Sequence, residues 1–319
     1  MQALFLDKTL TYREDLALPE LQNGDALIKL RLAGICATDL ELVKGYAGFK
    51  GILGHEFVGS VEKVASIEHH HWLGRRVVGS INIGCRTCDV CHTQGPGHCQ
   101  NRSVLGIRGK NGVFADYFSL PVSNLWAVPE TIPDSSAIFT EPLAAALQAL
   151  EQLKDIEASR ILVLGPGRLG LLIAKALDLA HYPVTLAGRS PTSLLLPAQW
   201  DLSTALIQNL PENQFDCVID ATGQSGGFEQ ALRVVKPRGR VILKSTFAAH
   251  KAIDLTKIVV GELQILGSRC GPFDKALELL AQNLIPLETM IDGCYPLHAG
   301  IKAFSHATKS GVRKIILQP

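Results

Sequence analysis

Five side chains able to do chemistry lie between Gly34 and Glu56. They are a thiol, a hydroxyl, two carboxylates and an imidazole, from Cys36, Thr38, Asp39, Glu56 and His55. Cysteine and histidine in one short stretch, in a chain with no secretion signal, indicate zinc before they indicate a disulfide. The sequence therefore predicts a metal centre here.

Glu141 is the candidate for a third protein ligand of that metal. It stands before Pro142 in an apolar stretch. An unpaired carboxylate there would be costly to bury, whereas a metal ligand would be paired. Three protein ligands with one open position are typical of a catalytic zinc. We therefore expect Cys36, His55 and Glu141 to share one ion.

A second cysteine group is expected to hold another zinc. Its four thiols fall within one short loop, at Cys85, Cys88, Cys91 and Cys99. Four thiolates leave no open position, so such a site is structural. The alternative, four free thiols on an exposed loop, would leave oxidisable sulfur.

The remaining cysteines, Cys217, Cys270 and Cys294, are expected to be small buried hydrophobic residues. The run His69–His71 is expected to be a solvated loop, because adjacent residues cannot all face one ion.

A glycine-rich turn indicates a dinucleotide site. The motif is Gly165, Gly167 and Gly170, with Arg168 and Leu169 between the last two. It lies between the apolar strand 161–164 and the apolar helix 171–180, and this context makes the motif informative. The first glycine makes the turn, the second admits the pyrophosphate, and the third lets helix and strand pack. A tight turn without a ligand is the alternative.

The end of the next strand bears on the cofactor. NAD-binding chains carry an acid there, but this chain has Gly188, Arg189 and Ser190. Arginine can bind a 2′-phosphate through two nitrogens, so NADP(H) is favoured over NAD(H). The alternative is that Arg189 is only a surface charge. Thr222, Gly223 and Ser245, at the ends of later strands, are also expected to line the cofactor site.

Composition excludes several other classes of function. The 319 residues are 47% hydrophobic and 19% charged, with a net charge of +1. There is no broad basic field for nucleic acid and no apolar run of membrane-spanning length. An acid at Asp7 interrupts what would be a signal peptide. We expect a cytoplasmic globular protein that binds neither nucleic acid nor membrane.

The element pattern predicts two domains. Short alternating runs, among them 57–64, 76–83 and 113–120, indicate a β-rich first part. Asp134 to Ser136 are expected to cap a helix over residues 137–139. From Arg160 onward, strands and helices alternate, which indicates a doubly wound parallel sheet. The stretch 190–215 is short, so a helix of that fold is expected to be abbreviated there. The tail, with a strand at 314–317, is expected to return to the first domain.

These motifs, in this order, resemble the zinc-containing medium-chain dehydrogenase/reductase family, to which the alcohol dehydrogenases belong. The resemblance implies an α/β protein with a GroES-like β domain, residues 1–142 completed by 268–319, and a Rossmann domain over 143–267. It implies two zinc ions per chain, with Cys36, His55 and Glu141 as catalytic ligands. Glu56 matches a carboxylate that can join them, Asp39 a partner of the histidine, and Thr38 a proton relay.

The implied function is reversible hydride transfer between an alcohol, or its aldehyde or ketone, and NADP(H), in a homodimer or homotetramer. Glutamate rather than cysteine as third ligand resembles the polyol, sugar and threonine dehydrogenases, so an NAD-dependent enzyme of that kind is the alternative. A zinc-free quinone or enoyl reductase and a sensor without turnover are further alternatives. Glu41 replaces a histidine that ends the proton relay in many members, and a salt-bridged surface acid is its simplest interpretation.

Overall fold

A computed structural model describes residues 1–157, 159–245, 253 and 255–319. The chain divides into two compact units, Met1–Glu141 with Phe273–Pro319, and Pro142–Pro272. Helix α4 (Thr140–Glu151) starts in the first unit and continues into the second. Of the helices in the described part, none has the length and apolar character needed to span a bilayer.

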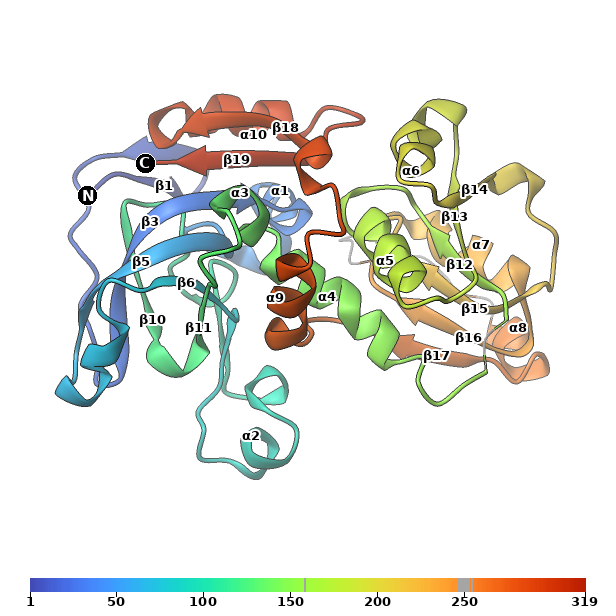
Figure 1. Cartoon of the computed structure of the whole chain (residues 1–319), viewed down its shortest axis with the longest axis horizontal. Helices are drawn as coiled ribbons and strands as arrows, with labels where there is room; N and C mark the ends of the chain where they lie inside the picture. Colours follow the sequence, from blue (N-terminus) through green and yellow to red (C-terminus); the bar gives the residue numbers. More distant parts are fainter. Residues whose placement is uncertain (158, 246–252, 254) are drawn as a thin grey trace. The chain divides into compact units, whose positions relative to one another are not determined.

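The first unit is built around a seven-stranded sheet (Figure 1). Its path is β11-β6-β5-β3-β19-β18, with β10 also paired to β3. Smaller sheets, β2-β1-β4 and β7-β8-β9, flank it. The strands are β1 (Ala3–Leu6), β2 (Leu10–Arg13), β3 (Asp25–Ile35), β4 (Gly51–Ile52), β5 (Glu56–Val64), β6 (Arg76–Gly79), β7 (Asn82–Ile83), β8 (Ser103–Leu105), β9 (Gly109–Lys110), β10 (Tyr117–Pro121), β11 (Leu125–Ala127), β18 (Ile291–Pro296) and β19 (Lys314–Gln318).

Short helices connect these strands. The α-helices are α1 (Ala37–Val43), α2 (Asp89–Thr93), α3 (Asp134–Ala137), α9 (Phe273–Ala281) and α10 (Gly300–Ala307). The 3-10 turns are η1 (Tyr46–Gly48), η2 (Ile67–Trp72), η3 (Pro96–His98), η4 (Val122–Asn124), η7 (Leu287–Met290) and η8 (Leu297–Ala299). The core of this unit is apolar and includes Leu4, Ile28 and Phe114, each without exposed surface.

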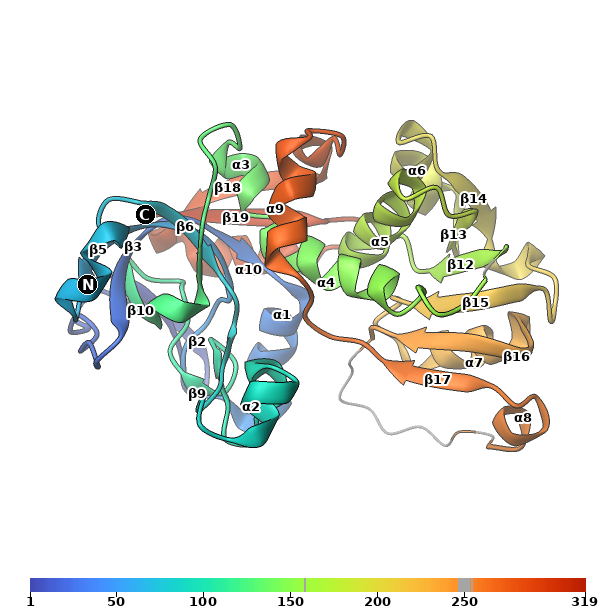
Figure 2. The same ribbon diagram turned by 60° about the horizontal axis from the view of Figure 1, so that its bottom comes forward.

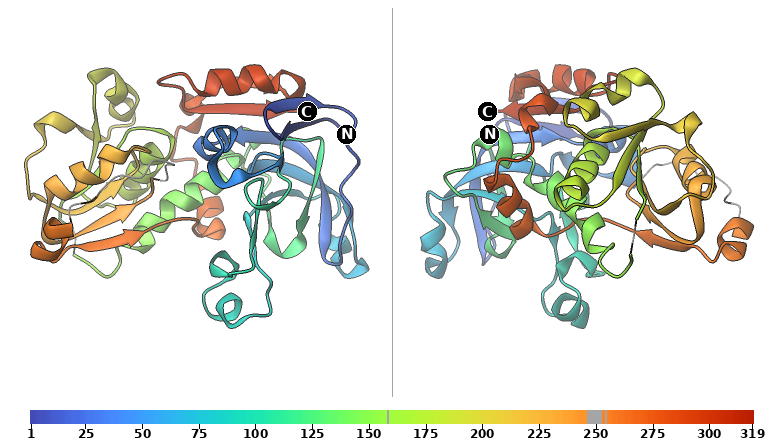
Figure 3. Two further views of the ribbon diagram at one scale, coloured as in Figure 1. Left: turned by 180° about the vertical axis from the view of Figure 1, so that it is seen from behind. Right: turned by 45° about the vertical axis from the view of Figure 1, so that its right-hand side comes forward.

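The tail of the chain completes the central sheet, as expected. Strand β19 pairs antiparallel with β3, placing Ile315 opposite Ile35 and Ile316 opposite Gly34. Strand β18 then adds to β19 in parallel. Figure 3 shows these red C-terminal strands and α10 from behind, beside blue strands from the N-terminal part.

Two local predictions for this unit were wrong, and a third was confirmed. Residues 76–83 form two strands, because the Asn124 side chain binds the carbonyls of Ser80 and Asn82 and so holds the turn between β6 and β7. Residues 113–116 lie outside the main sheet, since Phe114 N–H bonds Leu53 O instead. The histidine run lies in the 3-10 turn η2 between β5 and β6, with His70 and His71 exposed and His69 partly exposed, so its predicted solvated position is confirmed.

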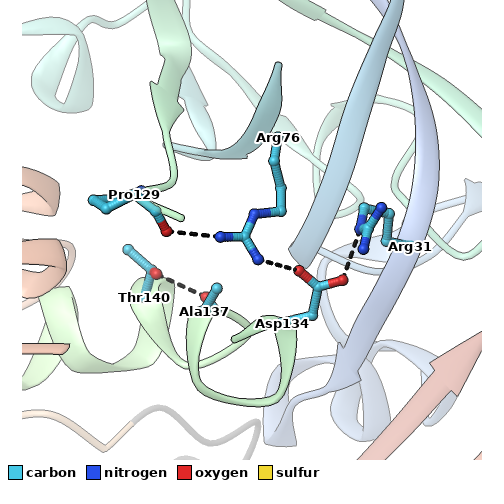
Figure 4. Close-up of polar contacts among 6 residues, drawn as sticks. All are labelled: Arg31, Arg76, Pro129, Asp134, Ala137 and Thr140. Atoms are coloured by element: carbon cyan, nitrogen blue, oxygen red, sulfur yellow. Dashed lines mark hydrogen bonds and ion pairs between the residues drawn. The ribbon is translucent and has the colours of Figure 1, made fainter. Parts of the chain in front are cut away.

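Asp134 also differs from its expected role as a helix cap. Helix α3 follows Pro133 and has no side-chain cap. Instead, the Asp134 carboxylate accepts hydrogen bonds from Arg31 Nε at 2.6 Å and Arg76 Nη1 at 2.8 Å (Figure 4). The two arginines come from β3 and β6. The carboxylate therefore ties α3 to the central sheet.

The second unit is the expected doubly wound parallel sheet (Figure 2). Its order is β14-β13-β12-β15-β16-β17, in which the chain reverses direction across the sheet between β12 and β15. Ligands of such sheets bind at the carboxyl ends of the strands near this reversal. The strands are β12 (Ile161–Leu164), β13 (Val184–Gly188), β14 (Ser203–Leu206), β15 (Phe215–Asp220), β16 (Val235–Leu243) and β17 (Gln264–Gly267).

Helices cover the strands of this sheet. Helix α5 packs on β12 and β13, and α7 packs on β15 and β16. The segment after Ser190 is abbreviated, as expected, since α6 has five residues. Strand β14 in that segment was not predicted. The helices are α5 (Arg168–Leu179), α6 (Leu195–Gln199), α7 (Ser225–Val234) and α8 (Leu255–Val260), with turns η5 (Pro191–Leu194) and η6 (Ile207–Asn209).

Candidate metal centres and dinucleotide site

Cys36 lies where a buried strand turns into a helix. It follows the last residue of β3 and is the N-cap of α1. Its backbone N–H donates to Asp39 Oδ2 at 2.8 Å. Its Sγ lies 3.9 Å from Thr38 Oγ1. The first turn of α1 thus holds the thiol and places the hydroxyl beside it.

Strand pairing brings His55 and Glu56 to Cys36. Strand β5 begins at Glu56, which pairs with Gly34 of β3, two residues before Cys36. His55 and Glu56 are buried, with 3% and 1% of their surface exposed. One potential ligand atom from each of Cys36, His55 and Glu56 lies within 4.8 Å of the other two. A partly buried sulfur donor this close to buried nitrogen and oxygen donors suits a zinc ion.

The His55 ring faces a carboxylate on one side. Its Nδ1 lies 3.3 Å from Asp39 Oδ1. These two buried atoms are not aligned as a hydrogen bond, and neither has another hydrogen-bond partner within the described residues. An ion on the other ring nitrogen would fix the proton on Nδ1, toward Asp39. The geometry therefore fits His55 as a metal ligand oriented by Asp39.

The electrostatics of this group also favour a cation. Burial lowers the pKa of His55, but the negative charges of Asp39 and Cys36 raise it more, so the net pKa is well above its ordinary value. The residues around the ring thus attract positive charge. A divalent ion would supply that charge directly.

Glu56 and Glu141 occupy different surroundings. Glu56 forms a buried ion pair with Lys314 at the start of β19. Glu141 lies in the first turn of α4, partly buried, and is not one of the three residues whose ligand atoms come together. The role of Glu141 as third ligand therefore stays a prediction. Within the first turn of α4, the Thr140 hydroxyl donates to Ala137 O at 2.7 Å and so joins α4 to α3 (Figure 4).

The four-cysteine loop has the dimensions of a zinc–thiolate site. Three of its sulfur–sulfur distances are 3.6 Å (Cys99–Cys85), 3.9 Å (Cys85–Cys91) and 3.9 Å (Cys88–Cys99). Zinc–sulfur bonds of about 2.3 Å in a tetrahedron give sulfur–sulfur distances of about 3.8 Å. A disulfide would require about 2.05 Å. The loop is therefore shaped for an ion rather than for disulfides.

Local backbone features shape this loop. Arg86 adopts a positive φ of 61°, and its N–H points to Cys91 Sγ at 3.3 Å. A Cβ on Gly84 would lie 2.9 Å from Cys91 Sγ. Hydrogen bonds from Thr87 and Cys88 lower the pKa of Cys85 to about 5, whereas burial and the neighbouring thiols raise the pKa of Cys91 to about 12. Four thiolates cannot share this space without a cation among them.

The other cysteines differ from one another. Cys217 is buried, as expected, and burial raises the pKa of its thiol to about 12. Cys270 is partly buried. Cys294 is exposed, so its predicted burial was wrong. It sits on β18, which has only β19 as a neighbour within the described residues.

The glycines of the dinucleotide loop have three different surroundings. Gly165 has φ 98°, which an L-residue rarely adopts. A Cβ on Gly170 would lie 1.9 Å from Gly165 O, so helix and strand pack closely there. Beside Gly167 there is open space for 4 Å. Gly165 thus has the features of a turn and Gly170 those of a packing contact. Gly167 leaves room for a diphosphate to approach the start of α5.

The end of β13 carries the predicted cofactor residues. Arg189 is exposed. Ser190 caps η5, accepting from Ser193 N at 3.4 Å, while Ser193 Oγ donates to Ser190 O at 2.7 Å. A Cβ on Gly188 would lie 2.5 Å from Ser193 Oγ, so this position has no room for a side chain. Ser193 was missed, although serine three residues after serine is a turn signal.

A buried carboxylate organises the remaining cofactor candidates. Asp220 Oδ1, at the end of β15, accepts from Thr222 N at 2.9 Å, Thr222 Oγ1 at 2.8 Å and Ser245 Oγ at 3.1 Å. Gly223 N–H donates to Ser245 Oγ at 2.8 Å. Asp220 was missed, although an acid ending a buried apolar strand could have indicated it. Thr222, Gly223 and Ser245 thus form one bonded group beside the point of sheet reversal.

Known proteins match both parts of the chain. Residues 22–130 match the family model of the alcohol dehydrogenase GroES-like domain, and residues 195–282 match that of zinc-binding dehydrogenases. The expected GroES-like and Rossmann folds are thereby confirmed. An erythritol/L-threitol dehydrogenase of Mycolicibacterium smegmatis is 28% identical over 93% of this chain and 91% of its own length.

Solved structures match the whole chain. A zinc-binding dehydrogenase from Sinorhizobium meliloti 1021, bound to NADP, is 26% identical with a TM-score of 0.88 and covers 100% of this chain and 99% of its own. A short chain alcohol dehydrogenase from E. coli CFT073, complexed with NADH, is 24% identical with a TM-score of 0.89 and the same coverage. The second likeness shows the fold alone. The two structures hold different nicotinamide cofactors, NADP in the first and NADH in the second.

Proposed function

Because the chain belongs to the zinc-containing, alcohol dehydrogenase-like family of medium-chain dehydrogenases and reductases, we propose that it interconverts an alcohol and its aldehyde or ketone with NADP(H) as hydride carrier. Members of this kind are NAD(P)-dependent oxidoreductases that act on CH–OH groups, and this chain is one of them. The close group of the partly buried Cys36 with the buried His55 and Glu56 is the observation that carries the proposal.

Zinc is proposed at two sites with different tasks. Cys36, His55 and Glu141 hold the catalytic ion, with Glu56 beside it, and Cys85, Cys88, Cys91 and Cys99 hold the structural one. The catalytic ion, when bound, polarises the substrate oxygen and lowers the pKa of the alcohol. Asp39 keeps the His55 ring in place. Thr38, whose hydroxyl lies beside Cys36 Sγ, passes the substrate proton outward.

The end of that proton path differs from the histidine found in many relatives. Glu41 is bound to Lys44 at 2.8 Å on the surface of α1. This pairing supports the interpretation of Glu41 as a salt-bridged surface acid. Bulk water then takes the proton from Thr38.

NADP(H) is proposed over NAD(H) because of the end of β13. The 2′-phosphate carries roughly two negative charges near neutral pH. Neither Gly188 nor Ser190 would repel it, and the exposed Arg189 guanidinium can donate two parallel hydrogen bonds to it. The Ser190 hydroxyl accepts from Ser193 N and keeps its own proton to donate.

A polyol or sugar dehydrogenase is the second candidate. It is supported by the relative named for erythritol and L-threitol, and by the glutamate proposed as third ligand. A panel of simple alcohols, polyols, sugar acids and threonine, each with NADP and with NAD, separates the two candidates. Nicotinamide absorbance should change with at least one substrate in zinc-loaded protein. No change across the panel would contradict an enzyme and support a cofactor-binding sensor.

A further inference from the structure

A buried ion pair lies directly beside the candidate catalytic ligands. Lys314 Nζ donates to Glu56 Oε2, and each side chain is 2% exposed. Removing two charges from water costs several kcal/mol for each ion, and their attraction often fails to offset this cost. A buried pair is thus poorly explained by stability alone.

Three strands create the space for this pair. Glu56 begins β5, Lys314 begins β19, and β3 lies between them with Gly34 opposite both Glu56 and Ile316. A Cβ on Gly34 would lie 2.3 Å from Glu56 Oε2 and 3.3 Å from Lys314 Nζ. Gly34 has an ordinary φ, so the missing side chain, rather than backbone freedom, is what this position requires.

Lys314 is also held from its other side. Its Nζ lies 5.3 Å from the centre of the Phe139 ring, which has no exposed surface. A cation over an aromatic face is attracted to it. The ammonium group therefore has a fixed position between an aromatic ring and a carboxylate, 258 residues along the chain from that carboxylate.

The pair restricts what Glu56 can do at the metal. A carboxylate oxygen of Glu56 lies within 4.8 Å of the Cys36 sulfur and a His55 nitrogen, so Glu56 is within reach of a shared ion. One of its oxygens is engaged by Lys314. We infer that Lys314 is a positioning residue, which restrains Glu56 beside the catalytic metal and keeps it from becoming a full ligand.

Charge supports this role. A Cys36 thiolate, one glutamate and the buried Asp39 carboxylate together already carry more negative charge than a divalent ion balances, so the Glu56 carboxylate would add to that excess. The ammonium of Lys314 offsets that extra charge. Without it, the Glu56 carboxylate would be buried and unpaired, and the metal would be its nearest available cation.

This inference rests on the proposed catalytic metal site, and its test reads metal binding rather than turnover. Wild-type protein and Lys314→Met are loaded with Co²⁺ at the catalytic site, with zinc kept in the four-cysteine site. The Cys36→Ser variant provides the blank. In Lys314→Met, we expect weaker ligand-field bands from an added oxygen ligand. Release of the metal to a chelator should be slowed about tenfold, because the freed Glu56 carboxylate adds a bond to the ion; loss of a group that only orients metal ligands would instead weaken metal binding.

Three variants identify the cause. Lys314→Arg keeps the charge and should restore wild-type release. Glu56→Gln with Lys314→Met should lose the slowing, because an amide replaces the freed carboxylate. Lys110→Met removes a partly buried lysine of the same unit that binds Ser119 instead, and should change nothing. If Lys314→Met does not fold, Lys314→Gln, which keeps a donor but no charge, carries the same measurement.

The outcomes are distinguishable. Wild-type protein that binds no Co²⁺ at Cys36 and His55 would overturn the proposed function and this inference together. Wild-type binding with an unchanged spectrum and release rate in Lys314→Met would overturn this inference alone. Equal slowing with and without the Glu56 carboxylate would also overturn it, because Lys314 would then act by its charge and not through Glu56.

Discussion

Arg189 is the residue on which the proposed cofactor preference depends. A charge-assisted hydrogen bond contributes about 1.5–3 kcal/mol, or roughly a ten- to hundredfold change in affinity. Arg189→Ala should therefore weaken NADP binding by about that factor and leave NAD binding nearly unchanged. Calorimetry with both cofactors measures this. Arg189→Lys keeps the charge but loses the paired donors. Its affinity for NADP should therefore lie between those of wild-type protein and Arg189→Ala. Wild-type protein that binds NAD as tightly as NADP would refute the assignment.

Single cysteines separate the two proposed zinc sites. Cys88→Ser should lower the zinc content by one ion per chain and lower the melting temperature, because a structural zinc contributes folding free energy. Cys36→Ser should also lose one zinc and abolish turnover, with little change in melting temperature. Metal analysis and thermal unfolding measure both effects. Cys294→Ser, at the exposed cysteine, is the control. An equal fall in melting temperature in Cys88→Ser and Cys36→Ser would contradict the assignment of one structural and one catalytic zinc.

The helix pair that carries Glu141 depends on Asp134. Asp134→Ala removes the contacts of α3 with Arg31 of β3 and Arg76 of β6. The side chains are partly exposed, which weakens ion pairs, so we expect a loss of about 1–2 kcal/mol in unfolding free energy. Denaturant unfolding provides the measurement. Asp15→Ala, which breaks the exposed Arg13–Asp15 pair, should leave the unfolding free energy nearly unchanged. Equal effects would mean that α3 is not held by Asp134.

The start of β12 in the second unit is held by Asp216, and this contact should depend on pH. Burial raises the pKa of Asp216, but Lys236, Ser159 and the N–H of Arg160 lower it further, so the net pKa is below its usual value. A lowered pKa in the folded state gives stability that is complete above the ordinary carboxyl pKa of about 3.9 and is lost as pH falls through the folded value.

Asp216→Asn tests this pH dependence. At neutral pH the variant should melt at a lower temperature than wild-type protein, since Ser159 Oγ and the two N–H groups lose a charged acceptor. Below about pH 4 the difference should shrink, because the carboxyl of the unfolded chain gains a proton there, and that of the folded protein gains one only at its lower pKa. Thermal unfolding from pH 3 to pH 7 follows the change. If the difference in melting temperature between wild-type protein and Asp216→Asn stays constant over this range, the charge of Asp216 does not stabilise the fold.

At the scale of the whole molecule, assembly is predicted from the family resemblance. We expect a homodimer or homotetramer built through the nucleotide-binding domains, as fold-level analogy suggests. Light scattering should give two or four times the chain mass of 34.4 kDa. Measurement over a range of protein concentrations distinguishes a stable assembly from a weak one. A mass of 34.4 kDa throughout would refute the prediction.

The sequence by itself determined the features that short spacing encodes. Four cysteines in one loop indicated a metal lobe, and the structure brings their sulfurs to zinc–thiolate distances. The apolar strand, glycine turn and apolar helix from 161 to 180 were recognisable because each signal is local to a few residues. The same holds for Cys36 and Thr38, which one helical turn places side by side.

Only the tertiary structure decided which distant residues meet. Lys314 reaches Glu56 because β19 takes a particular register on β3, and no local pattern encodes that pairing. Asp134 resembled a helix cap in sequence, yet its carboxylate accepts hydrogen bonds from two arginines on separate strands instead. Glu141 is not one of the three residues whose ligand atoms come together, so its role as third ligand stays a prediction. Residues a few positions apart meet because local backbone geometry places them together, and their spacing shows this. Distant residues meet through strand register and packing, and many different local sequences are compatible with the same register.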